Sequence, residues 1–217
     1  MEKSSDRLPE QFMELLKNTE YINRSRIPEV DLYMDQVLAF MNDHLKYSAR
    51  DPEHDRILTK TMINNYVKNG ILMAPDKKKY SPEHMMILMM IFYLKSFLSI
   101  EDIGQILQPV KDAAGIRRKH AEPARDSGQE KKMELGSVYD EIFAGVNKSV
   151  EFFAEDFRRK YTDAMEAFDK EDLPAEEKER LRRVYLVCQM GAEIYLHKLL
   201  IERMIDAGDF DGSQDAG

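Results

Sequence analysis

The chain has 217 residues, of which 43% are hydrophobic and 33% charged, and its net charge is -8. These proportions exclude a chain that is disordered by composition, and the longest apolar run, Met85 to Leu94, is about half of the roughly 20 residues of a membrane-spanning helix. The N-terminus has no apolar stretch of signal-peptide length, and one cysteine allows no internal disulfide, so we expect a cytoplasmic protein with no membrane contact.

Basic residues gather between positions 56 and 80, although the chain as a whole is acidic. The segment has one anion, Asp76, against six cations, so its local charge is +5 and the rest of the chain carries -13. Such an island indicates a local surface for a negatively charged partner. The six cations are Arg56, Lys60, Lys68, Lys77, Lys78 and Lys79.

The N-terminal half predicts four helices and very little strand, because apolar residues recur at intervals of three and four. The first is expected to begin at Pro28 and end near Tyr47. A short helix follows from the N-cap Thr59 to Gly70. Ser81 and Pro82 open a helix to about Phe97 that is apolar on nearly all sides, which is typical of a central buried helix. Ser99 and Asp102 resemble a capping box for a last helix that ends before Pro109.

The C-terminal half predicts a helical hairpin after a highly charged segment. Two long helices are expected over residues 137–170 and 174–207, and their short connection makes them antiparallel. Two helices alone bury little surface, so we expect the hairpin to dimerise or to dock on the N-terminal domain. The apolar positions of the two helices are Phe143, Val146, Val150, Phe153, Phe157 and Tyr161, then Leu181, Val184, Cys188, Tyr195 and Leu199.

The helix that begins at Thr59 has two chemically different faces. Thr61, Asn64, Asn65 and Lys68 share one face, and the opposite face is apolar (Ile63, Tyr66, Val67). Asn bonds adenine in the major groove, Thr meets the thymine methyl, and Lys reaches guanine or phosphate. The lysine loop, residues 77–79, would then lie on the phosphate backbone. The predicted DNA-binding residues are Lys60, Thr61, Asn64, Asn65, Lys68, Lys77, Lys78, Lys79 and Tyr80, although Tyr80 could instead pack beneath the loop.

These residues also resemble those of a known family. Tyr66, Lys68, Gly70 and Leu72 coincide with residues of the MerR-type winged helix-turn-helix regulators, and Lys78 stands where their loop arginine contacts phosphate. Residues 28–108, through the strings 31–37, 58–72 and 77–81, are also similar to a bacterial domain-of-unknown-function family of predicted transcriptional regulators. The resemblance implies sequence-specific binding to double-stranded DNA as a homodimer, with recognition helix 59–69 in the major groove.

The expected organisation is therefore all-α, with a MerR-like helix-turn-helix domain followed by the hairpin. We expect an N-terminal arm (1–27), the helix-turn-helix domain (28–110), a charged linker (111–136), a hairpin for dimerisation or effector binding (137–207) and a disordered tail (208–217). The alternative is a protein-interaction adaptor that keeps the winged-helix shape and binds an acidic partner through the lysine loop.

Enzyme chemistry is not expected, because the sequence has no phosphate loop, nucleophile elbow or metalloprotease motif. We therefore predict no catalytic residue, no cofactor and no metal; Glu193 and His197 lie four residues apart and lack further ligands in matching places. Cys188 is expected to be buried on its apolar stripe. His54 and His84 flank the basic island and are expected at the surface.

Overall fold

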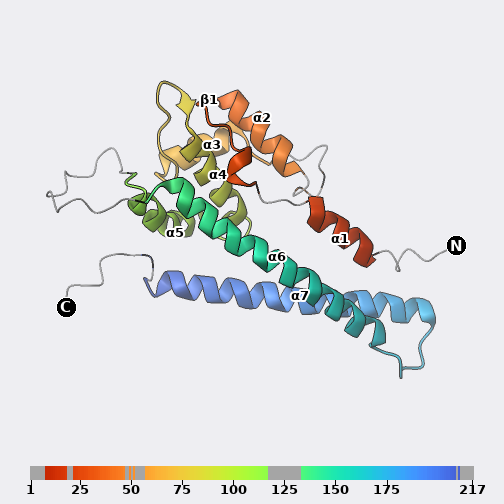
Figure 1. The fold of residues 1–217 in the computed structure, drawn as a ribbon. Coiled ribbons are helices and arrows are strands. Elements are labelled where there is room, and N and C mark those ends of the chain that lie inside the picture. The colour runs from red at the N-terminus through yellow and green to blue at the C-terminus, as the bar shows by residue number, and fades with distance from the viewer. Residues whose placement is uncertain are drawn as a thin grey trace. The chain divides into compact units, whose positions relative to one another are not determined.

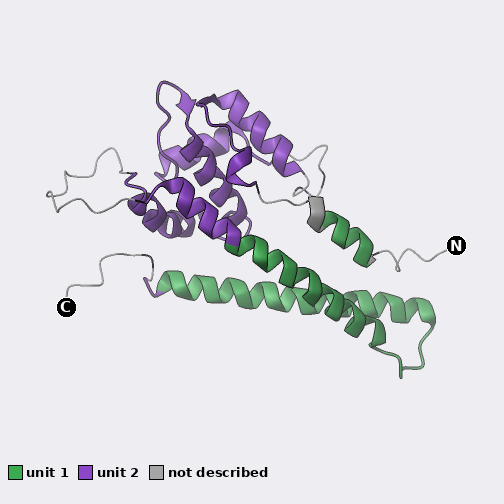
Figure 2. Cartoon of the chain, in the orientation of Figure 1, with its two compact units in different colours: residues 1–20, 145–206 green, residues 21–144, 207–217 purple. Residues whose placement is uncertain are grey.

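The computed structural model describes residues 8–18, 22–46, 49, 51, 57–116, 133–208 and 210. These contain seven α-helices, a short 3-10 helix (Arg24–Arg26) and a two-stranded sheet (Figure 1), which confirms the predicted all-α class. The chain divides into two compact units (Figure 2): unit 1 is residues 1–20 and 145–206, and unit 2 is residues 21–144 and 207–217. Arg56, His54, most of the predicted linker and most of the predicted tail lie outside the described residues.

Unit 2 contains the segment that the sequence singled out. Its elements are β1 (Leu32–Tyr33), α2 (Met34–Leu45), α3 (Lys60–Lys68), β2 (Lys79–Tyr80), α4 (Pro82–Leu94), α5 (Ile100–Ala113) and the first part of α6 (Leu135–Glu166).

The two strands account for one error in the predicted elements. β1 pairs with β2 in antiparallel register, Leu32 opposite Tyr80 and Tyr33 opposite Lys79. The first helix therefore begins at Met34 and not at Pro28. Its start is set locally, since the side-chain oxygen of Gln36 accepts the N–H of Tyr33 at 2.9 Å. Strand β1, which precedes the helix, forms only because it pairs with residues more than forty positions along the chain. Helical periodicity in the sequence cannot reveal such a distant pairing.

Helix α4 lies at the centre of unit 2, as its uniform apolarity predicted. Every residue from His84 to Ile91 is buried. His84 was expected at the surface, and that prediction is wrong: the residue is only 7% exposed. Helix α4 is exposed at Glu83 but buried from His84 to Ile91, so this side chain already belongs to the core.

Helix α5 begins at the predicted capping box but runs past its predicted end. Asp102 N–H donates to Ser99 Oγ at 3.1 Å, and Ser99 N–H donates to the Asp102 carboxylate at 3.3 Å. The helix continues through Pro109 to Ala113. Leu107 and Lys111 are buried on either side of the proline, and such tertiary contacts offset the hydrogen bond that proline removes. The first residues of the predicted linker are therefore helical.

Unit 1 contains the predicted hairpin and a helix from the N-terminal arm. Its elements are α1 (Leu8–Asn18), the second part of α6, and α7 (Ala175–Asp206). The core between α6 and α7 consists of Phe157, Ala164 and Leu186. The Phe12 ring of α1 lies 3.9 Å, centroid to centroid, from that of Phe157. Both predicted long helices are present, at bounds that differ by a few residues.

The apolar stripe predicted for the second helix of the hairpin does not face the first. Leu186 packs in the hairpin core, whereas Val184 and Tyr195 are 58% and 64% exposed. Cys188 is also exposed, so its predicted burial is wrong. Helix α7 is apolar on several faces, and periodicity alone could not tell which of them meets α6. By length and composition alone, α7 could also cross a membrane, and only 6% of its apolar window is buried.

Candidate nucleic-acid interface

Helix α3 is defined by caps at both ends. At its start, Thr59 Oγ1 accepts the N–H of Met62 at 3.3 Å. At its end the chain turns at Gly70, whose φ of 69° lies in the left-handed region, and the N–H groups of Ile71 and Leu72 donate to the Tyr66 carbonyl. The sequence placed both caps correctly because cap signals are local.

The apolar face of α3 is buried and its polar face is exposed, as predicted. Ile63 and Tyr66 are buried in unit 2, at 0% and 4% exposure, and burial raises the pKa of the Tyr66 hydroxyl. The predicted contact residues of this helix are all exposed. We call them the α3 face: Lys60, Thr61, Asn64, Asn65 and Lys68.

Asn42 of α2 holds the segment that leads into α3. Its side-chain oxygen accepts the N–H groups of Ile57 and Leu58 at 2.9 and 3.2 Å. Its amide nitrogen donates to the Leu58 carbonyl at 3.1 Å and to the Leu38 carbonyl, within α2, at 2.7 Å. One carboxamide therefore fixes the backbone that enters α3 against the preceding helix.

Two lysines hold the backbone on either side of α3. Lys95 donates to the Ile57 carbonyl at 2.8 Å, and Lys111 donates to the Gly70 carbonyl at 3.1 Å. Burial lowers the pKa of Lys95, and Lys111 is only 4% exposed. An ammonium group near the C-terminal end of a helix also interacts favourably with the helix dipole. Asn42, Lys95 and Lys111 are not among the residues predicted from the sequence, since nothing local distinguishes them from other polar residues.

The lysine loop has an unusual backbone. Lys77 and Lys78 have φ values of 45° and 67°, and Lys79 N–H donates to the Asp76 carbonyl at 2.7 Å across the turn. Two consecutive residues with positive φ are typical of a type I′ turn, for which Asn-Gly is preferred. Each non-glycine residue in this conformation costs roughly 1 kcal/mol. The turn therefore keeps two exposed ammonium groups at its tip at a cost in stability.

The last two predicted contact residues lie differently. Lys79 is partly buried, and its ammonium lies 5.3 Å from the centre of the Tyr33 ring. Tyr80 is 3% exposed, and burial raises the pKa of its hydroxyl. Its ring meets the His84 ring edge-on, with centroids 5.5 Å apart. Tyr80 therefore packs beneath the loop, the second of the two roles that the sequence left open.

The exposed cations of this region are not neutralised by the rest of unit 2. Within the described residues, Lys60, Lys68, Lys77 and Lys78 form no ion pair, and the carboxamides of Asn64 and Asn65 bond no other residue. Figure 1 shows the loop between α3 and β2 beside the two helices that precede it. The arrangement offers donors, acceptors and positive charge to a partner outside the chain.

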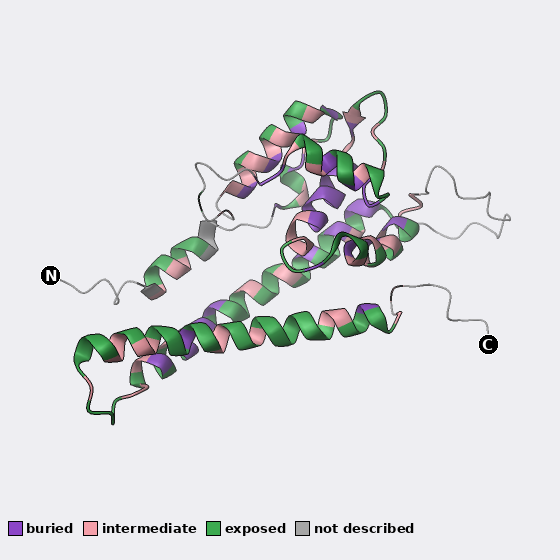
Figure 3. Ribbon diagram, turned by 180° about the vertical axis from the view of Figure 1, so that it is seen from behind, coloured by how far each residue is buried: buried purple, intermediate pink, exposed green. Residues whose placement is uncertain are grey.

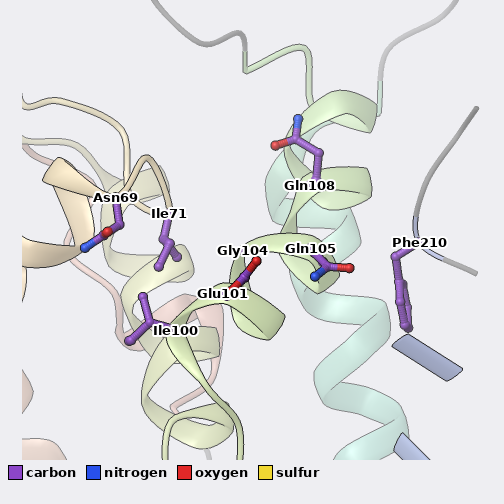
Figure 4. Close-up of a pocket in the computed structure, with 8 residues that line it drawn as sticks. All are labelled: Asn69, Ile71, Ile100, Glu101, Gly104, Gln105, Gln108 and Phe210. Carbon is purple, nitrogen blue, oxygen red and sulfur yellow. The ribbon is translucent and has the colours of Figure 1, made fainter. Parts of the chain in front are cut away.

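A cavity of about 650 Å³ borders the end of α3 (Figure 4). Its walls come from α5 and from the residues that follow α3, and they carry mainly carboxamide and aliphatic side chains. No group of three or more His, Cys, Asp or Glu residues in the described ranges could hold a metal ion. The lining residues are Asn69, Ile71, Ile100, Glu101, Gly104, Gln105, Gln108 and Phe210.

Comparison with known proteins finds one family. Residues 22–125 match the family described as "Domain of unknown function (DUF1836)", and the match includes α2, α3, the lysine loop, α4 and α5. This agrees with the predicted resemblance to a domain-of-unknown-function family, while the MerR-type resemblance has no support in the match. No curated protein and no solved structure matches the chain.

Proposed function

We propose that the protein is a sequence-specific DNA-binding transcriptional regulator with a winged helix-turn-helix of MerR type. Helix α3 enters the major groove, and the lysine loop contacts the phosphate backbone. The observation that carries the proposal is the α3 face, where two carboxamides, a hydroxyl and two ammonium groups are exposed on a helix whose other side is buried. Those groups can read base edges as well as phosphates.

The lysine loop supports the same function independently. Lys77 and Lys78 occupy positions at which Asn and Gly would cost less, so the charge at the tip is retained against the backbone preference. Strain of this kind is a pointer to function, because it persists only where the surrounding structure holds it. A phosphate backbone is one partner that such a pair of ammonium groups fits.

The adaptor alternative accounts for only part of this surface. A lysine loop suits an acidic protein as well as DNA, but Asn64 and Asn65 side by side add no charge. They add paired donors and acceptors, which suit the edge of adenine. We therefore prefer DNA, with homodimeric binding to paired half-sites as the expected mode.

The proposal is tested by selecting genomic fragments on the full-length protein and titrating the selected fragments by fluorescence anisotropy. With about three to six phosphate contacts per protomer, log Kd should change with log salt with a slope of roughly 3 to 5, or twice that for a dimer. Selected fragments should bind more tightly than scrambled ones. Absence of salt-sensitive binding at low ionic strength contradicts the proposal, and a stoichiometric protein partner without DNA enrichment supports the adaptor.

A further inference from the structure

Helix α7 exposes far more apolar surface than a lone helical hairpin should leave in water. In the hairpin core Leu186 is buried and Met190 is partly buried, and Ile205 near the end of the helix is also buried. On the rest of the helix several large apolar side chains are more than half exposed, and Figure 3 shows mostly exposed residues along α7. We call these residues the outward face of α7: Val184 (58%), Val187 (68%), Ile194 (66%), Tyr195 (64%), Leu196 (59%) and Leu200 (60%).

The outward face is an extended exposed apolar surface. Its six residues are each 58% to 68% exposed, and a large exposed apolar patch is typical of a surface that binds another protein.

At Gly191, in the middle of this face, no packing contact within the described residues requires a glycine. A Cβ added there would meet no atom within 4 Å, and a glycine inside a helix costs about 1 kcal/mol relative to alanine. The glycine is therefore not needed for packing on α6. It lies between Cys188 and Tyr195 on the same side of the helix, where it would let a second helix approach closely.

The charges on α7 indicate the identity and direction of that second helix. Arg180 and Glu202 lie near the two ends of the outward face, and Gly191 is exactly midway between them in the sequence. In an antiparallel pair of α7 helices crossing at Gly191, Arg180 of each chain therefore meets Glu202 of the other. In a parallel pair each of these residues would face its own copy, which places like charges together.

We propose that a second copy of this chain covers the outward face of α7, with the two α7 helices antiparallel and crossing at Gly191. The two hairpins then form a four-helix arrangement, in which the exposed apolar side chains are buried. This inference names a surface and an orientation, and it holds whether or not the protein binds DNA.

The same face is less suited to lipid. The most apolar stretch of helix α7 includes two charged residues, Glu193 and Lys198. Glu193 accepts a hydrogen bond from the buried ammonium of Lys160 of α6 at 2.6 Å. Charged groups in the middle of a bilayer cost several kcal/mol. In the single chain Arg180 pairs with Glu176 and Glu202 with Lys198, all at the surface, so these pairs can be shared with a second copy at little cost.

The charge pairing is tested by sedimentation equilibrium of the full chain, with helix content followed by circular dichroism. Arg180→Glu and Glu202→Arg should each raise the dimer dissociation constant by about tenfold, because each variant places like charges together at two sites of the dimer. The double variant R180E/E202R should restore wild-type association. A wild-type chain that stays monomeric at all concentrations, or a dimer that neither reversal weakens, overturns the proposal.

The orientation is tested by cross-linking in a Cys188→Ser background. Position 184 precedes Gly191 by as many residues as position 198 follows it. The cysteine of Val184→Cys in one chain therefore faces the cysteine of Lys198→Cys in the other chain only when the two helices are antiparallel. A short bismaleimide should link a mixture of the two variants into heterodimers and should link neither variant alone. Efficient linking of either variant alone, or flotation of a monomeric chain with phosphatidylglycerol vesicles, overturns the proposal.

Discussion

Asn42 binds Leu58 through both its peptide N–H, at 3.2 Å, and its carbonyl, at 3.1 Å. The two residues lie on opposite sides of a segment that the sequence marked only as a loop. Since Leu58 directly precedes the N-cap of α3, this pair of hydrogen bonds sets where α3 begins relative to α2. Asn42 is thus a positioning residue for the α3 face, although it is not part of that face.

Removing the Asn42 carboxamide should therefore weaken both the fold and DNA binding. Asn42→Ala leaves the N–H groups of Ile57 and Leu58 without their acceptor, and an unsatisfied buried group costs about 1 to 3 kcal/mol. We expect a loss of about 2 to 4 kcal/mol in the free energy of unfolding, measured by urea denaturation. Asn42→Asp retains the acceptor and should lose less; equal stability of all three proteins would contradict the assigned role.

Replacing the two lysines at the tip of the lysine loop should make the protein more stable and weaken its binding to DNA. Replacing Lys77 with Asn and Lys78 with Gly supplies the residues that a type I′ turn prefers, so we expect a gain of about 1 to 2 kcal/mol in the free energy of unfolding. The same double variant should weaken binding to all DNA sequences alike and reduce the salt slope by about 2. The control variant K77R/K78R keeps both charges and should retain binding. If the Asn-Gly variant binds DNA with unchanged affinity, the loop is not part of the DNA interface.

Asn65 should affect discrimination between sequences more than overall affinity. Asn65→Ala is expected to cost about 1 to 3 kcal/mol for cognate DNA and much less for scrambled DNA, because a carboxamide contacts base edges. Asn147→Ala is the matched control: it makes the same change at an exposed helical position in unit 1. Anisotropy titrations with both DNAs measure the difference. An equal loss on cognate and scrambled DNA would place Asn65 on the phosphates.

The buried His84 should make the protein less stable in acid. Burial lowers its pKa, although the backbone groups of Ala74 and Met73 and the charges of Glu83 and Asp31 act in the opposite direction. Its Nδ1 accepts the Ser81 N–H at 3.0 Å, which a protonated ring cannot do. Because the unfolded chain binds the proton more readily, this contribution is fully present above the ordinary pKa of about 6.5 and is lost as the pH falls through and below that value.

This pH dependence is measured as the urea midpoint between pH 8 and pH 5. His84→Gln places an uncharged acceptor at the third helical position, where Gln caps the helix start, so it should retain the cap and flatten the profile. The other histidines are unchanged and provide the baseline. If the wild-type protein and the variant lose stability equally between these pH values, His84 is not the responsible group.

The sequence by itself determined the features that depend on near neighbours. The caps at Thr59, Ser99 and Asp102 are contacts within three residues, so they could be read directly. The polar face of α3 also follows from the periodicity of its own sequence. Ile63 and Tyr66 lie on one side of the helix and are buried, so the opposite, polar side is exposed. For these reasons the helices and the exposed α3 face were predicted closely.

Only the tertiary structure decided what depends on distant partners. The pairing of Leu32 with Tyr80 moved the start of α2, and the buried neighbours of Pro109 carried α5 past its expected end. The supports of α3, Asn42, Lys95 and Lys111, bind backbone groups far along the chain, and no local pattern records such partners. Helix α7 is apolar on several faces, and the position of α6 decided which face was buried and which remained exposed.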